Sequence, residues 1–202
     1  MVEYILLFLT SYLIGSIPFG YLVGKYGKGI DIRDYGSGNI GVANCYRVMG
    51  SKYAIMVLIG DCLKGIFPVL ITRWLTTEQI SFYLLVGLFA IIGHNWSIFL
   101  KFKGGKGIAT TYGVVLAFYP YIAIISALIW GAIVLKTKFA ALGSIASVSF
   151  MLVLSFLFKT PLEFKIFTIL IIIFAIIRHH VNIIRLLKKK ENRIVSKNDE
   201  KK

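Results

Sequence analysis

Residues 53–75 read YAIMVLIGDCLKGIFPVLITRWL, an apolar run that contains only three charged residues. As a helix it would rise about 35 Å, enough to cross the roughly 30 Å hydrocarbon core of a bilayer. Four further stretches have the same character: Tyr4–Gly24, Ile80–Leu100, Phe139–Phe158 and the shorter Leu162–Ile177. The pattern predicts an all-α, polytopic integral membrane protein.

The composition supports this class of protein. Hydrophobic residues make up 57% of the 202 residues, charged residues make up 16%, and the mean hydropathy is +0.79. Soluble domains are about 45–50% apolar and about 25% charged, and the same figures exclude disordered, coiled-coil and collagen-like chains. Cys45 and Cys62 match neither a disulfide framework nor a zinc-ligand spacing. The start, MVEYILLF, lacks the basic segment of a cleavable signal peptide, so we expect the first apolar run to be retained.

A sixth apolar run, Ile108–Leu135, is too long for one comfortable span and contains Pro120. Proline removes a backbone donor and clashes with the preceding turn, so the run forms one kinked helix or two short ones. The positions of the basic residues along the chain favour two short helices. If the run goes out and returns, 19 of the 23 Lys and Arg residues fall on one side of the membrane, as expected for the cytoplasmic side. The chain is therefore predicted to have seven transmembrane helices, with the N-terminus outside and the C-terminus in the cytoplasm.

The net charge of +14 has a second interpretation, because a basic soluble domain often binds nucleic acid. No soluble domain remains in this chain, so we expect no nucleic-acid partner. We predict one membrane domain over residues 1–187. Residues 188–202, KKKENRIVSKNDEKK, are predicted to form a disordered cytoplasmic tail that is attracted to anionic lipid headgroups.

The first of three polar clusters is DYGSGNIGVANCYR at residues 34–47. Its glycines let backbone amides turn toward an anion, and its Ser and Asn side chains add donors. Arg47 can bind a phosphate through two parallel hydrogen bonds. The alternative is a flexible loop, and neither a Walker A motif nor a GxGxxG turn in a βαβ unit is present.

The second cluster, GHNWSIFLKFKGGKGIATTYG, covers residues 93–113. His94 and Asn95 fall in an apolar helix, where polar groups are costly and indicate function. The KGGKG turn opens the next helix, whose N-terminal amides suit an anion, with Lys106 as a point charge. The alternative is a basic loop that only sets topology, although topology does not require the paired glycines.

The third cluster, IIRHHVNIIRLLKKKEN, covers residues 176–192. On a single helix, His179, Asn182 and Leu186 would share one face. A lone histidine in this position is more often a capping or snorkelling residue, but Asn182 on the same face favours a functional role. We expect no metal site, because the cluster offers one pair of histidines and no carboxylate on that face.

Two pairs of polar residues fall within the predicted spans. Asp61 and Lys64 lie three residues apart, so we expect a structural ion pair rather than a proton relay. Ser144 and Ser147 are typical of small residues at helix contacts. The three clusters themselves lie on the predicted cytoplasmic side, which indicates a site there for phosphorylated compounds, with apolar grooves for a lipid chain.

Five blocks of the chain form a recognisable series: GSIPFGYLVGK at 15–25, GSGNIGVANCYR at 36–47, DCLKGIFPV at 61–69, the block at 93–113 and RHHVNIIRLL at 178–187. In this order they closely resemble the PlsY-type glycerol-3-phosphate acyltransferases. The resemblance implies a seven-helix enzyme of the bacterial inner membrane whose active site faces the cytoplasm. Such an enzyme transfers a fatty acyl group from acyl phosphate to the 1-hydroxyl of glycerol 3-phosphate, without acyl-CoA or acyl carrier protein, and we expect no cofactor. The products are lysophosphatidic acid and phosphate, in the first step of phospholipid synthesis.

The resemblance also implies which residues form the site. The catalytic residues would be Lys106, His179 and Asn182. The phosphate-binding residues would be Ser37, Arg47, Lys106, Ser144, His179 and Asn182. The blocks that would approach acyl phosphate contain Gly36, Gly38, Asn39, Gly41, Asn44, Gly104, Gly105 and Gly107.

Acyl phosphate is an activated mixed anhydride, so an alcohol can attack it directly. The sequence agrees, since it contains neither a GxSxG elbow nor an obvious Ser-His-Asp set. His179 would act as the general base, or would only hold the acceptor while the substrate's own phosphate takes the proton. Two other classes remain as alternatives: a membrane transporter of a phosphorylated metabolite and a non-catalytic lipid-binding assembly protein.

Overall fold

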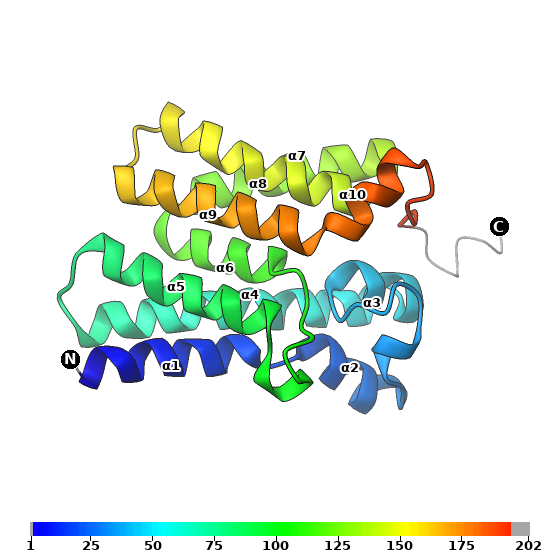
Figure 1. Cartoon of the computed structure of the whole chain (residues 1–202), viewed down its shortest axis with the longest axis horizontal. Coiled ribbons are helices and arrows are strands. Elements are labelled where there is room, and N and C mark those ends of the chain that lie inside the picture. The colour runs from blue at the N-terminus through cyan, green and yellow to red at the C-terminus, as the bar shows by residue number, and fades with distance from the viewer. Residues whose placement is uncertain (1, 195–202) are drawn as a thin grey trace.

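A computed structural model describes residues 2–194 of the chain. In this range the regular secondary structure is entirely helical, so the expected all-α class is confirmed (Figure 1). The helices are α1 (Val2–Ser16), α2 (Phe19–Lys28), α3 (Val42–Met49), α4 (Ser51–Leu75), α5 (Ile80–Asn95), α6 (Ile108–Phe118), α7 (Pro120–Thr137), α8 (Ala140–Leu157), α9 (Leu162–Arg178) and α10 (His180–Leu187), with 3-10 turns η1 (Ile32–Asp34) and η2 (Ile98–Leu100).

The long helices run side by side between two ends of the molecule. α1 begins at one end, and α2, α3 and α10 lie at the other (Figure 1). Contacts join α1 to α5, α4 to α6 and α7 to α8, while α9 packs on α8. Segments from both halves of the sequence therefore meet at the second end.

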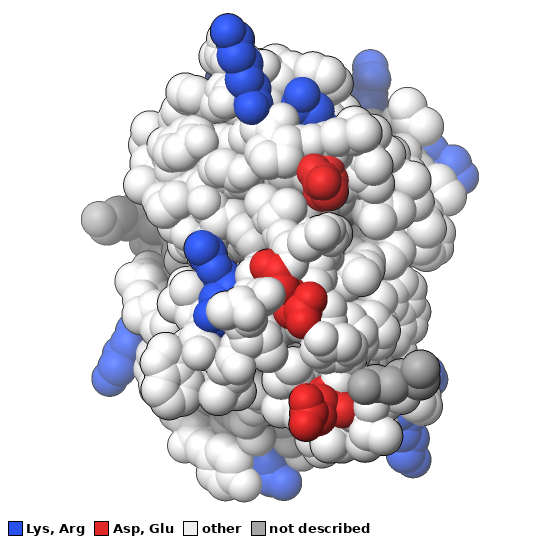
Figure 2. Space-filling view, turned by 90° about the vertical axis from the view of Figure 1, so that its left-hand side faces the viewer, with Lys and Arg blue, Asp and Glu red and all other residues white. Residues whose placement is uncertain are grey.

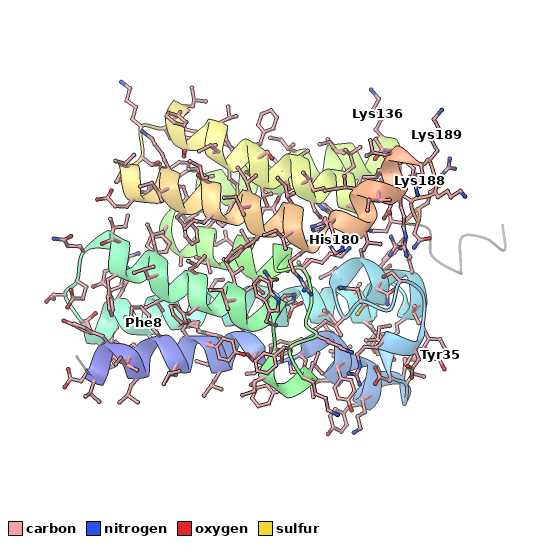
Figure 3. The ribbon with its side chains drawn as sticks, in the orientation of Figure 1. Phe8, Tyr35, Lys136, His180, Lys188 and Lys189 are labelled. Carbon is pink, nitrogen blue, oxygen red and sulfur yellow. The ribbon has the colours of Figure 1, made fainter. Side chains whose placement is uncertain are left out.

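The two ends differ in charge. At the end where α1 begins, acidic and basic side chains both lie among a surface made mostly of other residues (Figure 2). At the opposite end, Lys136, Lys188 and Lys189 project outward (Figure 3). This second end, which comprises α2, α3, α10 and the loops at residues 29–41 and 96–107, is termed the basic end below.

Five segments are long and apolar enough to cross a membrane: Val2–Lys28, Ser51–Leu75, Ile80–Leu100, Pro120–Thr137 and Ala140–Leu157. α9 and α10 together would make a sixth, bent by 65°. α6 has 11 residues and rises about 17 Å, which is too short to cross the hydrocarbon core by itself. The number of seven spans and the orientation of the termini stay predictions.

Proline marks two of the breaks between helices. The apolar run at 108–135 divides at Tyr119, and Pro120 becomes the first residue of α7, where a helix does not need its amide. α6 runs away from the basic end and α7 returns to it, so the two-helix form of this run is confirmed (Figure 1). The predicted Tyr4–Gly24 helix is not continuous, because Pro18 separates α1 from α2.

The chain also turns at His179, so the prediction that one helix carries His179, Asn182 and Leu186 on a shared face is wrong. α9 ends at Arg178, and α10 leaves it at 65°. At the turn, both the imidazole Nδ1 and the backbone amide of His179 donate to the Ala175 carbonyl, at 2.8 and 2.9 Å. The turn places His179 and Asn182 inside the protein, at 2% and 9% exposed.

Residues 188–194 return to the bundle after α10. The amide of Ile194 donates to the Lys138 carbonyl at 2.7 Å, and the side chain of Glu191 is buried. These residues therefore belong to the folded part of the chain. The rest of the predicted disordered tail, residues 195–202, lies outside the described residues.

The contact between α1 and α5 shows how closely the helices approach. A Cβ on Gly15 would lie 2.1 Å from the Ala90 carbonyl oxygen, and Ser11 Oγ donates to the Val86 carbonyl at 2.6 Å. Small residues and hydroxyls of this kind are typical of helix contacts in membrane proteins. Packing, rather than backbone conformation, requires this glycine.

We predict that Gly15→Ala destabilises the protein by about 1–3 kcal/mol, because the added methyl group must push α1 away from α5. Gly131→Ala in α7 is the matched control, since its added Cβ would meet no neighbouring atom within 4 Å and alanine is the better helix former. Thermal unfolding in detergent measures both variants. Equal unfolding midpoints for the two would contradict the prediction.

Candidate active site

A cavity of about 380 Å³ lies at the basic end, between α3, α4, α6, α7, α8 and the turn from α9 to α10. Its wall contains all six side chains that were predicted to bind phosphate. They come from segments far apart in the sequence: Ser37, Arg47, Lys106, Ser144, His179 and Asn182. The fold therefore brings the three predicted clusters into one site.

Three side chains from separate segments form a chain of hydrogen bonds in this wall. Lys106 Nζ donates to Asn182 Oδ1 at 2.5 Å, and Asn182 Nδ2 donates to Glu191 Oε1 at 2.7 Å. The carboxylate thus fixes which way the amide points, and the amide oxygen holds the ammonium. Glu191 also lines the cavity, and sequence reasoning missed it. Its only signal was a single acid after a run of lysines.

Arg47 is held by the same returning segment. Its Nε donates to the Arg193 carbonyl at 3.0 Å, and its Nη2 donates to the Asn192 carbonyl at 3.2 Å. Carbonyl oxygens satisfy these donors without cancelling the charge of the guanidinium. Arg47 therefore keeps its positive charge for an anion in the cavity.

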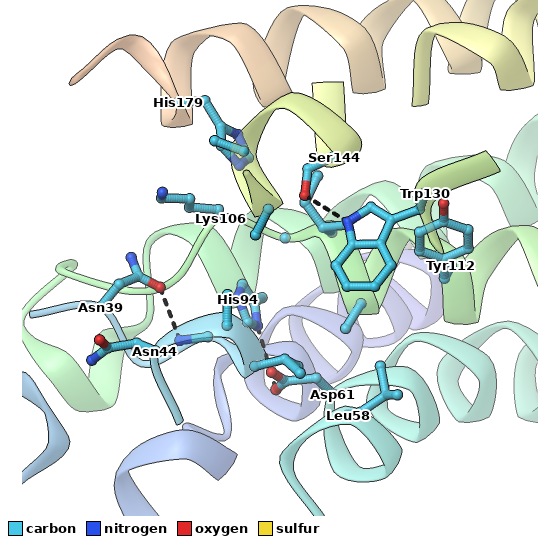
Figure 4. A pocket seen from close by; sticks show the side chains of 18 of the residues that line it. Asn39, Asn44, Leu58, Asp61, His94, Lys106, Tyr112, Trp130, Ser144 and His179 are labelled. Carbon is cyan, nitrogen blue, oxygen red and sulfur yellow. Dashed lines mark hydrogen bonds and ion pairs between the residues drawn. The ribbon is translucent and has the colours of Figure 1, made fainter. Parts of the chain in front are cut away.

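The imidazole of His179 presents one free nitrogen to the cavity. Its Nδ1 donates to a carbonyl, which can only accept, so Nε2 is the acceptor nitrogen of the neutral ring. Figure 4 shows the ring directed toward the space beside Lys106. A hydroxyl group bound there can donate to Nε2.

The loop at residues 34–47 is shaped by Asn44. Its Oδ1 accepts the amide of Ser37 at 2.8 Å, and its Nδ2 donates to the Tyr35 carbonyl at 3.0 Å. Gly36 has a φ of +61°, and a Cβ there would lie 2.4 Å from Asn44 Oδ1. This part of the sequence therefore needs glycine and asparagine to present Ser37.

The predicted glycine-rich blocks contribute unequally to the cavity wall. The members that line it are Asn39, Gly41, Asn44 and Gly107. Gly36, Gly38, Gly104 and Gly105 do not line it. A Cβ on Gly104 or on Gly105 would lie 2.1 Å from an atom of His94, so these two glycines allow the loop to pack against the end of α5.

Asp61 and Lys64 form the predicted ion pair, with Oδ1 and Nζ 2.7 Å apart and both side chains 2% exposed. Lys64 Nζ also donates to the Ile17 carbonyl at 2.7 Å. His94 Nδ1 lies 3.5 Å from Asp61, and both of these side chains line the cavity (Figure 4). The pair therefore ties α4 to the break after α1, next to the site.

The rest of the cavity wall is apolar. Members of this part include Leu58, Leu116, Ile124, Tyr112 and Trp130. Trp130 Nε1 donates to Ser144 Oγ at 3.2 Å (Figure 4). A cationic end joined to an apolar groove suits a ligand that carries both a phosphate and a hydrocarbon chain. The sequence did not single out these apolar residues, because they are ordinary in a membrane helix.

Lys106 loses its proton more readily than an ordinary lysine. Burial, together with the neighbouring Arg47, Arg178 and Arg185, lowers the pKa of Lys106 from 10.5 to about 8, and Glu191 partly offsets this effect. Cations that are partly buried together repel one another. A phosphate in the cavity would supply the negative charge that stabilises them.

Residues 2–194 contain no group of three His, Cys, Asp or Glu side chains that could hold a metal ion. Cys45 and Cys62 are free thiols, in agreement with their spacing in the sequence. The expectation that the protein needs neither a metal nor a cofactor stays a prediction.

The sequence around the cavity matches a known family over most of its length. A family model described as glycerol-3-phosphate acyltransferase matches residues 5–189. The chain belongs to this family. The glycerol-3-phosphate acyltransferase of Trichlorobacter lovleyi is 45% identical over 184 residues, which cover 91% of this chain and 93% of the relative. That of Desulforudis audaxviator is 40% identical over 189 residues, which cover 94% of each chain.

Solved structures agree with this membership. The chain is similar to a crystal structure of PlsY, an integral membrane glycerol 3-phosphate acyltransferase, in its glycerol 3-phosphate form. The TM-score is 0.89 and the identity 38%, over 95% of both chains. The lysophosphatidic acid form of PlsY gives a TM-score of 0.87 at 37% identity, with the same coverage. The predicted PlsY-type family and the integral membrane class are therefore confirmed.

We predict that Glu191→Ala destabilises the protein by about 1–3 kcal/mol, because it leaves the buried amide of Asn182 without an acceptor. Glu191→Gln keeps an acceptor oxygen and should therefore lose less stability than Glu191→Ala. Glu163→Ala, an exposed acid in the first turn of α9, is the control and should lose less than about 1 kcal/mol, the usual size of a helix-dipole contribution. Thermal unfolding in detergent compares the three, and a Glu191→Ala variant as stable as the control would refute the role of this carboxylate.

Proposed function

We propose that this protein transfers a fatty acyl group from acyl phosphate to the 1-hydroxyl of glycerol 3-phosphate, giving lysophosphatidic acid and inorganic phosphate. The hydroxyl oxygen bonds to the acyl carbon, and the bond between that carbon and the phosphate oxygen breaks. The hydroxyl proton ends on the released phosphate, and no acyl-enzyme forms. The PlsY structures in glycerol 3-phosphate and lysophosphatidic acid forms support the choice of acceptor and product.

One observation carries the proposal: a single cavity joins cationic phosphate ligands to an apolar groove. Arg47 and Lys106 lie in the polar part of its wall, while Leu116, Ile124 and Trp130 lie in the apolar part. Acyl phosphate needs both surfaces at once, since its head is an anion and its tail is a hydrocarbon chain. Glycerol 3-phosphate needs only the polar part.

The main chemical task is to bring two anions together. Arg47 and Lys106 reduce the repulsion between the two phosphate groups, and Ser37 and Ser144 add hydroxyl donors. Holding both substrates in one cavity makes the attack effectively intramolecular, which can supply much of the rate acceleration. Donors that face the acyl oxygen stabilise the charge that it gains during attack.

His179 and Asn182 complete the site. Nε2 of His179 can accept the hydrogen bond of the attacking hydroxyl, so the proton reaches the leaving phosphate either directly or through this nitrogen. Asn182 acts through Lys106, whose ammonium it holds at 2.5 Å. Its amide therefore positions the charge rather than reacting.

For the membrane, we propose seven crossings with the basic end in the cytoplasm. α6 and α7 supply the short outward and return arms, and residues around them shield the ends of α6 from lipid. The basic end collects the loops rich in Lys and Arg, as the positive-inside rule requires of a cytoplasmic face. In this orientation the site would face the cytoplasm at the bacterial inner membrane.

The arrangement argues against the transporter alternative. A transporter needs a polar path across the bundle. Within the described residues, a buried apolar cluster fills the interior between the cavity and the opposite end. It includes Leu88, Val115 and Val148. The site therefore resembles an enzyme cavity with one cationic end.

We predict that Lys106→Ala and Arg47→Ala each lower acyl transfer by about 100-fold or more, because each removes a charged donor to a phosphate. The assay uses purified protein, acyl phosphate and labelled glycerol 3-phosphate, with lysophosphatidic acid and phosphate as the measured products. Lys103→Ala removes an exposed lysine from the same loop and should keep wild-type turnover. Wild-type turnover in Lys106→Ala or Arg47→Ala would defeat the assignment, and absence of product with wild-type protein would defeat the reaction itself.

We predict that kcat/KM falls as pH rises above about 8. The pKa of Lys106 is lowered to about 8, so the ammonium that binds phosphate is present below this pH and is lost above it. The loss should approach about tenfold per pH unit. Glycerol 3-phosphate is already a dianion in this range, because its second pKa is near 6.

Lys106→Arg tests the origin of this pH dependence. A guanidinium keeps its proton across the range, so the alkaline fall should disappear even if the rate at pH 7 is lower. Lys103→Arg is the control and should retain the fall. An alkaline fall that survives in Lys106→Arg would assign it to another group.

A further inference from the structure

Arg178, the last residue of α9, forms hydrogen bonds to the loop that carries Lys106. Its Nε donates to the Gly105 carbonyl at 2.9 Å, and its Nη2 donates to the Gly104 carbonyl at 2.8 Å. The guanidinium also lies over the ring of Trp96, 5.5 Å from its centroid. One planar fork therefore holds two consecutive peptide groups immediately before Lys106.

These two hydrogen bonds determine which way the next amide points. All described peptide bonds are trans, so the N–H of Lys106 points opposite to the Gly105 carbonyl. Because that carbonyl faces Arg178, the amide of Lys106 faces the other way. Among residues 2–194, no backbone carbonyl accepts this amide.

Within this loop, the cavity wall begins at Lys106. Lys106 and Gly107 line the cavity, whereas Gly104, Gly105 and Arg178 do not. The amide of Gly105 donates to the His94 carbonyl at 2.9 Å, so the loop is fixed on both sides. Two electronegative carbonyl oxygens are thus held out of the space that an anion would occupy.

The charge of Arg178 cannot be explained by an ion pair. The salt bridges within the described residues join Arg33 to Asp31 and join Lys64 and His94 to Asp61, and none includes Arg178. Its positive charge instead opposes the neighbouring ammonium of Lys106. This repulsion destabilises the empty site, which indicates that a bound anion would stabilise the two cations.

We propose that Arg178 is a positioning residue that turns the Gly104–Lys106 backbone so that both the amide and the ammonium of Lys106 face the substrate phosphate. This inference rests on the proposed function. Arg178 does not touch substrate; it acts through the two carbonyl groups. Carbonyl groups released from Arg178 would be free to rotate toward the phosphate and repel it.

The test compares Arg178→Lys, which keeps the charge but not the planar fork, with Arg178→Gln, which loses both. Arg185→Gln is the matched control, because Arg185 also lies near Lys106 but donates to neither carbonyl. We expect kcat/KM for glycerol 3-phosphate to fall about 10- to 100-fold in both Arg178 variants, since small misplacements have effects of this size. Arg185→Gln should stay within about twofold of wild type, because an exposed charge at this distance acts weakly.

A chemical rescue separates positioning from mere folding. Adding guanidinium at millimolar concentration should restore part of the activity of Arg178→Ala, because the free cation can occupy the space between Trp96 and the two carbonyl groups. It should not restore Lys106→Ala. Size-exclusion profiles and unfolding midpoints in detergent establish that each variant is folded.

Two results would overturn the inference: wild-type kcat/KM in Arg178→Lys, or no rescue of a folded Arg178→Ala. If Arg178→Ala does not fold, Arg178→Lys decides alone. Failure of the proposed function is distinguishable, because wild-type protein would then make no lysophosphatidic acid in the same assay.

Discussion

Several cations must be held together in a partly buried cavity without losing their charge, and the rest of the site depends on this constraint. Neutral oxygen atoms satisfy this constraint, because they accept hydrogen bonds without cancelling the charge of the cations. Carbonyl groups of Asn192 and Arg193 hold Arg47, and the amide oxygen of Asn182 holds Lys106. Carboxylates in these positions would neutralise the positive charge of the site. Carbonyl oxygens accept the hydrogen bonds and leave that charge available to a phosphate. Two acids line the cavity within the described residues: Glu191, which lies behind Asn182, and Asp61, which is paired with Lys64.

The breaks between helices place these groups at one end of the bundle. The helices break at Pro18, at Tyr119 and at His179. The turn at His179 buries an imidazole and an amide that a continuous helix would have carried past the cavity. Residues 188–194 then return over the site, so the segment after α10 supplies both a carboxylate and two carbonyl groups. Local irregularity in the helices is therefore what allows a membrane bundle to carry a polar site.

Much of this fold could be predicted because its signals are local. Apolar runs of about 20 residues mark the long helices, and Pro120 marks the division between α6 and α7. The glycine-rich turn before Lys106 and the polar clusters at 34–47 and 176–192 were equally visible. Arg178 was visible as a basic residue, but its two carbonyl partners could not be inferred from spacing. Glu191 falls in the predicted disordered tail, since a run of lysines gives no sign that the chain folds back.

By itself, the sequence determined that this is a helical membrane protein with cationic, donor-rich segments, because hydropathy, charge and glycine content are properties of short stretches. It also determined the family, since the motifs occur in order along the chain. Only the tertiary structure decided that Ser37, Arg47, Lys106, Ser144, His179 and Asn182 line one cavity, and which oxygens hold their charges. The physical reason is distance along the chain. The contacts that hold these charges join residues 76 to 146 positions apart, and they depend on how the helices pack and turn, which no local pattern records.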